Sequence, residues 1–70
     1  MMPLTMARTG EINLIKKISG KSEIRQHLET LGFIIGTPVM VVADIKGNVI
    51  VKIKESRIAI SREMATKIMV

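Results

Sequence analysis

The amino-acid sequence predicts a mainly β domain in the form of a small, closed or nearly closed barrel. Three observations favour this class: short runs rich in β-branched residues, turn signals about every eight to twelve residues, and a single segment with helical periodicity. We expect five strands, one short α-helix after the first strand and a helical turn before the last. Closure of a barrel leaves few strand edges to which other chains can pair.

The first strand is expected over residues 12–18, where β-branched residues are frequent, and Ser19-Gly20 ends it. Ser22 then offers a hydroxyl that can cap the N-terminus of a helix. Apolar residues follow at the i, i+4 and i+7 spacing of one helix face, at Ile24, Leu28 and Leu31. Gly32 comes next, where a residue in the left-handed conformation commonly ends a helix.

A hairpin is expected in the second half of the chain. Residues 39–43 form a continuous, valine-rich apolar run after a turn at residues 36–38. Lys46-Gly47-Asn48 is a tight-turn signal, after which Val49, Val51 and Ile53 alternate with other residues. This period of two is typical of a half-buried strand that pairs with the preceding one.

Two short strands and one helical turn complete the predicted fold. Residues 57–60 are β-branched or apolar apart from Arg57 and form a strand. Ser61 can cap a single helical turn through Ala65, and residues 68–70 can return as the last strand against the first. The chain shows no linker or repeat, so residues 1–70 are expected to form one domain.

The composition argues against an enclosed active site. A chain of 70 residues buries only about 60% of the surface that its unfolded form exposes. Hydrophobic residues make up 47% of it and charged residues 24%, which indicates a folded domain with an aliphatic core, since Phe33 is the single aromatic residue. All large apolar side chains are needed for packing, and none is left to line a substrate pocket of about 300 Å³ or more. We therefore expect no enzyme activity.

The location is expected to be cytoplasmic. The chain has no cysteine, which excludes disulfide bonds, a thiolate zinc site and a cysteine nucleophile. It also has no apolar stretch of about 18 residues and no signal-peptide pattern at its start, so we expect neither membrane insertion nor export.

A formal net charge of +5 favours acidic partners of some kind. The basic residues form no run longer than two, and a solvated surface is the favoured interpretation of them. A small nucleic-acid-binding barrel is an alternative that this charge permits. Proteins that bind single strands use exposed aromatic rings as stacking platforms, however, and Phe33 supplies at most one, so no nucleic acid is expected.

Several patterns imitate chemical sites. Gly20-Lys21-Ser22 resembles the end of a phosphate-binding loop, but Ile15 stands where the full motif requires glycine, and the chain is too short for the parallel sheet of such a domain. His27 is expected at the edge of the buried helix face, and no set of converging ligands accompanies it, so we expect no metal site and no cofactor. The methionines are expected to fill gaps in the core, at Met6, Met40, Met64 and Met69.

The order and spacing of several short segments resemble the ferrous iron transport protein A (FeoA) family over nearly the whole chain. The segments are Gly10-Glu11, Arg25-Gln26-His27-Leu28, Leu31-Gly32-Phe33, Gly36-Thr37-Pro38-Val39, Ile58-Ala59-Ile60 and, after Ala65, Ile68-Met69-Val70. The resemblance implies an SH3-like barrel, a module that also occurs at the C-terminus of iron- and manganese-dependent repressors.

The resemblance further implies a cytoplasmic accessory protein of ferrous iron uptake. It would act by contact with a FeoB-type permease, a membrane protein with a cytosolic GTPase domain, and not by catalysis. The implied contact surface is the helix and the turn after it: Arg25, Leu28, Leu31 and Phe33 would bind the partner, while Gly32 and Gly36 hold the loop. Core packing is the competing interpretation for Leu28 and Leu31. A monomer is expected, and a stand-alone relative of the repressor domain remains a further alternative.

Overall fold

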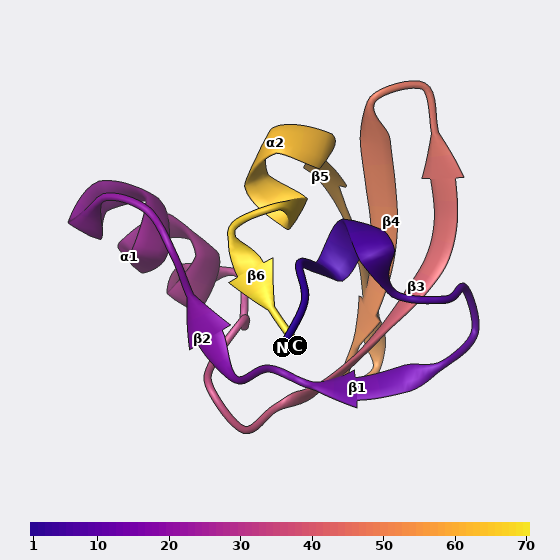
Figure 1. Cartoon of the computed structure of the whole chain (residues 1–70), viewed down its shortest axis with the longest axis horizontal. Coiled ribbons are helices and arrows are strands. Elements are labelled where there is room, and N and C mark those ends of the chain that lie inside the picture. Colours follow the sequence, from indigo (N-terminus) through magenta and orange to yellow (C-terminus); the bar gives the residue numbers. More distant parts are fainter.

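The computed structural model describes all 70 residues as a small mixed structure of six short strands and three helical segments. In chain order these are η1 (Leu4–Met6), β1 (Ile12–Leu14), β2 (Lys17–Ile18), α1 (Ser22–Thr30), β3 (Pro38–Ile45), β4 (Asn48–Ile53), β5 (Ser56–Ser61), α2 (Arg62–Ala65) and β6 (Ile68–Met69). Figure 1 shows α1 at one end and the β3–β4–β5 strands at the other, with η1, α2 and β6 between them. The mainly β class with two short α-helices is confirmed.

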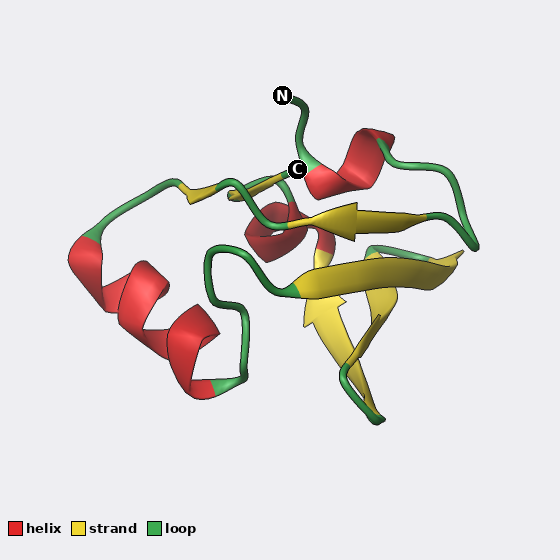
Figure 2. Cartoon of the chain, turned by 90° about the horizontal axis from the view of Figure 1, so that it is seen from below, coloured by secondary structure: helices red, strands yellow, loops and turns green.

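The strands form two antiparallel sheets and not one continuous barrel ladder. The larger sheet has the order β1-β3-β4-β5, and β2 pairs with β6 in the smaller one. Seen from below, the large sheet lies on one side of the molecule while α1 projects from the opposite end (Figure 2). The chain ends meet at the small sheet, where Met2 and Val70 exchange two backbone hydrogen bonds of 2.8 Å.

The first strand, expected over residues 12–18, is divided into β1 and β2. The structure therefore has six strands where five were predicted. Ile15 ends the pairing with β3: its N–H donates to Thr37 at 3.0 Å, and its carbonyl accepts from Gly36 at 2.8 Å. The next N–H, from Lys16, donates to Met69 at 2.8 Å. The chain therefore passes from one sheet to the other at residues 15–16, which form the corner between the two sheets. The prediction that the last strand pairs with the first run is confirmed at β2–β6.

The β3–β4 hairpin forms where it was predicted. Its turn has positive φ at both Lys46 (37°) and Gly47 (81°), the combination that suits the right-handed twist of a hairpin. The expected alternation is confirmed, because Val49, Val51 and Ile53 are all buried. The register of β3 shifts between Val41 and Ala43, as at a β-bulge, and the strand continues to Ile45.

The helix α1 ends as predicted but begins differently. Gly32 has φ of +105°, its N–H donates to Glu29, and the N–H of Phe33 donates to Leu28, both at 2.9 Å. This pair of bonds is the Schellman arrangement, which turns the chain back along the helix. Lys21, not Ser22, is the N-cap residue, and its side chain makes no capping bond. At α2, by contrast, Ser61 caps as expected and accepts from the Met64 N–H at 3.1 Å.

The core lies between the inner face of the large sheet, the small sheet and the helices. Fourteen residues are buried and none of them is polar: Leu4, Ile15, Ile18, Leu28, Phe33, Val39, Val41, Val49, Val51, Ile53, Ile60, Ala65, Ile68 and Val70. Of the methionines expected in the core, three are partly buried, but Met6 is 70% exposed because η1 turns it away from the sheet after burying Leu4.

Candidate docking surfaces

The structure gathers no cluster of side chains that are common metal ligands. No three His, Cys, Asp or Glu side chains come together in the 70 described residues, and no charged side chain is buried. His27 is exposed on α1, next to the buried Leu28. What the surface offers is hollows and exposed apolar side chains, which are features of docking surfaces.

The first hollow lies between α1 and the loop that follows it. It has a volume of about 280 Å³, and its lining is Lys17, Ile18, Arg25, Glu29, Phe33, Ile34 and Ile35. Arg25 is exposed on α1, one helical turn before Glu29, and no carboxylate lies within 4 Å of it. The structure thus brings Arg25 next to the loop.

Two of the predicted contact residues belong to the core instead. Leu28 and Phe33 are both 0% exposed, and Leu31 is half-buried against the same cluster. Phe33 is buried because the Schellman turn folds the chain back under α1 and directs the ring inward. The prediction that the Phe33 side chain contacts a partner is therefore corrected, and the core interpretation of Leu28 holds.

The apolar side chains that the loop exposes are the two that follow Phe33. Ile34 is 49% exposed and Ile35 65% exposed, although the sequence analysis gave neither a role. A signal was present: Phe33, Ile34 and Ile35 stand between two glycines, and a loop this short cannot turn three successive large side chains inward. Ile34 and Ile35 thus form an exposed apolar surface next to the cationic side chain of Arg25.

The two glycines that flank this loop, Gly32 and Gly36, both have a positive φ. Gly36 has φ of +90° and its N–H donates to the Ile15 carbonyl, which ties the loop to the corner between the two sheets. A Cβ atom built at Gly36 meets nothing within 4 Å, so the backbone conformation alone, and not space, requires glycine there.

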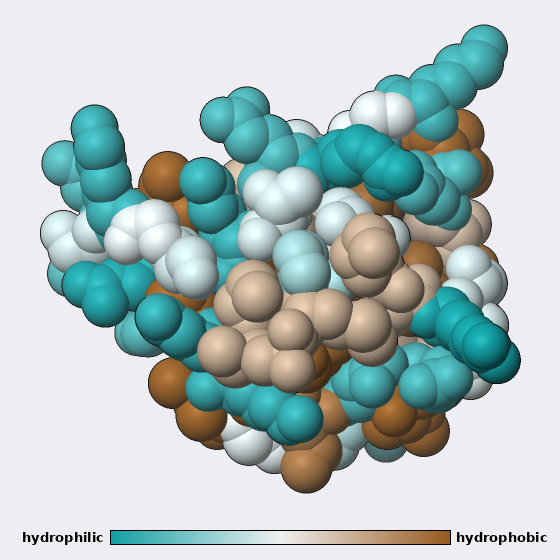
Figure 3. All heavy atoms as spheres, in the orientation of Figure 1, coloured by the Kyte–Doolittle hydropathy of each residue, from teal (hydrophilic) through white to brown (hydrophobic).

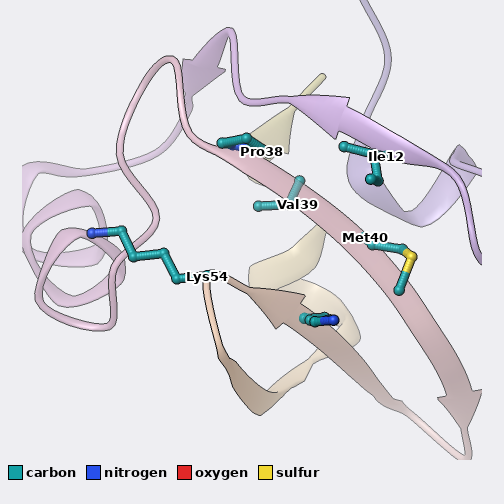
Figure 4. Close-up of a pocket in the computed structure, with 6 residues that line it drawn as sticks. Ile12, Pro38, Val39, Met40 and Lys54 are labelled. Atoms are coloured by element: carbon teal, nitrogen blue, oxygen red, sulfur yellow. The ribbon is translucent and has the colours of Figure 1, made fainter.

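The second hollow is a groove on the outer face of the large sheet, which the sequence analysis did not identify. It has a volume of about 370 Å³ and is lined by Ile12, Pro38, Val39, Met40, Lys52 and Lys54 (Figure 4). Figure 4 shows that these residues come from β1, from β3 and from the end of β4. The exposed apolar side chains on this face include Ile12 and Leu14, at 69% and 54% exposure.

A further apolar area covers the region of the chain ends. In Figure 3, pale brown atoms gather over the middle of this view, where Figure 1 places both termini and β6, and hydrophilic side chains surround them. Met1 is 73% exposed there, and Met2 and Met69 are partly buried. None of the helices is long and apolar enough to cross a bilayer.

Comparison with known proteins gives a consistent assignment. A family model described as the FeoA domain matches residues 2–70. The chain is 41% identical over 70 residues to an Fe(2+) transport protein A of Methanocaldococcus jannaschii, a match that covers 100% of this chain and 85% of that protein.

Solved structures share the fold. The crystal structure of an iron uptake regulatory protein (FeoA) matches with a TM-score of 0.86 and 25% identity, over 96% of this chain and 89% of that one. The zinc complex of Stenotrophomonas maltophilia FeoA, described as an SH3 domain protein, gives 0.83 and 21%, over 99% and 88%. A manganese-dependent transcriptional repressor gives 0.84 and 19%, over 94% of this chain but 38% of that one. These likenesses confirm the expected SH3-like fold.

Proposed function

The chain belongs to the FeoA family, and from this we propose that it is a non-catalytic, cytoplasmic accessory protein of ferrous iron uptake. It acts by protein–protein contact with a FeoB-type permease, on the cytosolic GTPase part of that protein. One observation carries the proposal: all fourteen buried residues are apolar and form the core, while Ile34 and Ile35 stand exposed beside Arg25.

The surface between α1 and the following loop is suited to protein contact. Exposed apolar side chains gain free energy when a partner removes them from water, at roughly 25 cal/mol per Å². Arginine is enriched among the residues that dominate binding energy, because its planar guanidinium can both stack and donate several hydrogen bonds. Arg25, Ile34 and Ile35, with the half-buried Leu31 at their edge, therefore replace the originally expected set as the proposed contact residues.

The structure argues against the alternative that the chain is a nucleic-acid-binding barrel. Phe33 is 0% exposed, so no ring is available on which a base can stack. The net charge of +5 supports weak, salt-dependent binding only, which a titration with DNA and RNA at rising salt measures. The remaining alternative is a relative of the repressor module, a manganese-dependent example of which shares this fold over 94% of the chain.

The test is equilibrium binding of the purified chain to the cytosolic GTPase part of the permease. Ile35→Ser and Arg25→Glu are expected to weaken binding about tenfold or more, which corresponds to about 1.4 kcal/mol. Ile45→Ser and Arg8→Glu are the matched controls, because both residues are exposed and lie outside the hollow. No binding by the wild-type chain refutes the proposed function. Equal losses in the variants and their controls refute the proposed surface.

A further inference from the structure

The outer face of the large sheet carries an ordered row of side chains across all four strands. The registers place Ile12 opposite Met40, Met40 opposite Lys52, and Lys52 opposite Arg57. Neighbouring strands lie about 4.8 Å apart, so this row spans about 14 Å. Its β1–β3 half is apolar and its β4–β5 half is cationic, with the groove of about 370 Å³ over the boundary.

The apolar half has no cover within the chain. Ile12 is 69% exposed, Leu14 is 54% exposed and pairs with the exposed Pro38, and Met40 is only partly buried. The inner positions of the same strands, such as Val39, already fill the core. These outer side chains lie outside the core cluster, so the expectation that all large apolar side chains are needed for packing was wrong.

The cationic half has no counter-charge within the chain. The one ion pair of the structure joins Arg62 to Asp44 at 2.5 Å, so no carboxylate lies within 4 Å of Lys52, Lys54 or Arg57. Lys52 and Arg57 stand directly opposite each other on paired strands, an arrangement of like charges that destabilises a sheet. A carboxylate placed between them relieves this repulsion.

We propose that this groove binds a short extended segment of a partner protein in which apolar side chains adjoin carboxylates. The apolar part covers Ile12 and Met40, and the acidic part meets Lys52, Lys54 and Arg57. An extended chain advances about 3.3 Å per residue, so four to five residues cover the row. The inference rests on the proposed function only for the identity of the protein that supplies this segment.

A protein segment suits the groove better than a membrane surface does. The apolar and cationic side chains lie side by side on one sheet face, whereas a bilayer places its charged headgroups above its apolar chains. A flat bilayer also cannot enter a concave site, but a single extended chain can. The groove lies on the sheet, while the surface of Arg25, Ile34 and Ile35 lies on α1 and its loop, so the two surfaces can be tested separately.

The test is an NMR titration of the whole ¹⁵N-labelled chain with the peptide acetyl-Leu-Val-Leu-Glu-Asp-Glu-amide. The amides of Met40, Lys52 and Arg57 are expected to shift in a saturable way. The matched peptide acetyl-Leu-Val-Leu-Lys-Lys-Lys-amide is expected to leave them unchanged. No shift with either peptide, equal shifts with both, or shifts confined to α1 and its loop overturn the inference.

Paired variants remove the effect of net charge. The Lys52→Glu/Lys54→Glu double variant is expected to weaken binding of the acidic peptide at least tenfold. Its control is the Lys21→Glu/Lys46→Glu double variant, which lowers the net charge by the same amount. Each double variant changes one lysine that has a positive φ, Lys54 in the first and Lys46 in the control. The control is expected to stay within twofold of the wild type. Equal losses of peptide affinity in the two double variants overturn the inference. The inference is also overturned if the chain does not bind the peptide but binds vesicles of anionic phosphatidylglycerol through Lys52 and Lys54, because that result assigns the groove to a membrane.

The same double variants distinguish this inference from the proposed function. If the permease's GTPase part binds the wild type and both double variants equally, the groove is not its docking site and the proposed function stands. If the acidic peptide binds in the groove while the permease part does not bind at all, the groove chemistry stands and the proposed function is wrong. Failure of both ligands to bind refutes both proposals.

Discussion

Phe33 shows how much a residue's role depends on the conformation of the turn that precedes it. The sequence places this single aromatic side chain directly after a helix-ending glycine, a position compatible with either an exposed anchor or a core residue. The positive φ of Gly32 and the bond from the Phe33 N–H to the Leu28 carbonyl direct the ring inward. The following two isoleucines are exposed as a result.

Phe33→Ala is therefore expected to destabilise the fold and not merely to weaken docking. Replacing a buried phenylalanine by alanine costs about 3–5 kcal/mol, which approaches the whole stability of a domain of this size. Ile34→Ala, on the exposed neighbour, is expected to change the free energy of unfolding by no more than about 0.5 kcal/mol. Urea denaturation of both variants measures the difference, and similar midpoints contradict the buried placement of Phe33.

Asn13 is the one residue whose buried polar atom lacks a partner. Its side-chain amide nitrogen is buried without a hydrogen bond, at a position on β1 that pairs with the buried Val39. Leaving such a group unpaired costs about 1–3 kcal/mol, and valine suits a strand. Asn13→Val is expected to raise the free energy of unfolding by about 1 kcal/mol in thermal or chemical denaturation. A loss of stability shows that Asn13 makes a bond in solution.

At the scale of elements, the two helices begin with different kinds of N-terminus. The Ser61 side chain accepts the Met64 N–H at the start of α2, whereas Lys21 precedes α1 and contributes no capping bond. Both serines that were expected to cap stand near a helix start, but Ser22 is already the first helical residue. A capping side chain accepts hydrogen bonds from residues two or three further on, so a shift of one position removes its function.

Ser61→Ala is expected to lower the free energy of unfolding by about 1 kcal/mol, because it removes this cap. Ser22→Ala is the matched control and is expected to leave stability nearly unchanged. Thermal unfolding followed by circular dichroism compares the two variants with the wild type. Equal effects at both positions would show that Ser61 does not cap α2 in solution.

Local signals predicted most of the elements. The hairpin turn, the alternation in β4, the end of α1 at Gly32 and the Ser61 cap each depend on a few neighbouring residues, and each was found as expected. The division of the first strand was missed because it depends on two distant partners, Thr37 and Met69, which pair with successive residues. The burial of Leu4 in η1 was missed for the same reason, since its packing neighbours come from the rest of the chain.

At the scale of the whole molecule, the aliphatic interior is used for packing and the function belongs to the exterior. The sequence predicted an outward-facing Phe33, whereas the structure buries that ring and exposes Ile34 and Ile35 beside Arg25. The groove on the sheet could not be found, because it combines residues from β1, β3 and β4 through their registers. Such a surface can be identified only when it is known which residues of neighbouring strands lie opposite one another.

Binding to the permease is expected to weaken as salt rises, because the proposed surfaces carry Arg25, Lys52 and Lys54 on a chain of net charge +5. The apolar contacts of Ile34 and Ile35 are not screened, so part of the affinity is expected to persist at high salt. Calorimetric titrations from about 50 to 500 mM salt, with the Debye length falling from roughly 14 to 4 Å, measure this dependence. An affinity independent of salt contradicts a role for the three cations.

The most direct test of docking by the exterior is methyl cross-saturation NMR on the complex with the permease's cytosolic GTPase part. The chain is labelled at its isoleucine methyl groups, which lie both on the surface and in the core. Saturation from the partner is expected at the exposed set Ile12, Ile34 and Ile35 and absent from the buried set Ile15, Ile60 and Ile68. Absence of saturation at every exposed isoleucine, under conditions where the partner is shown to be folded, contradicts the account.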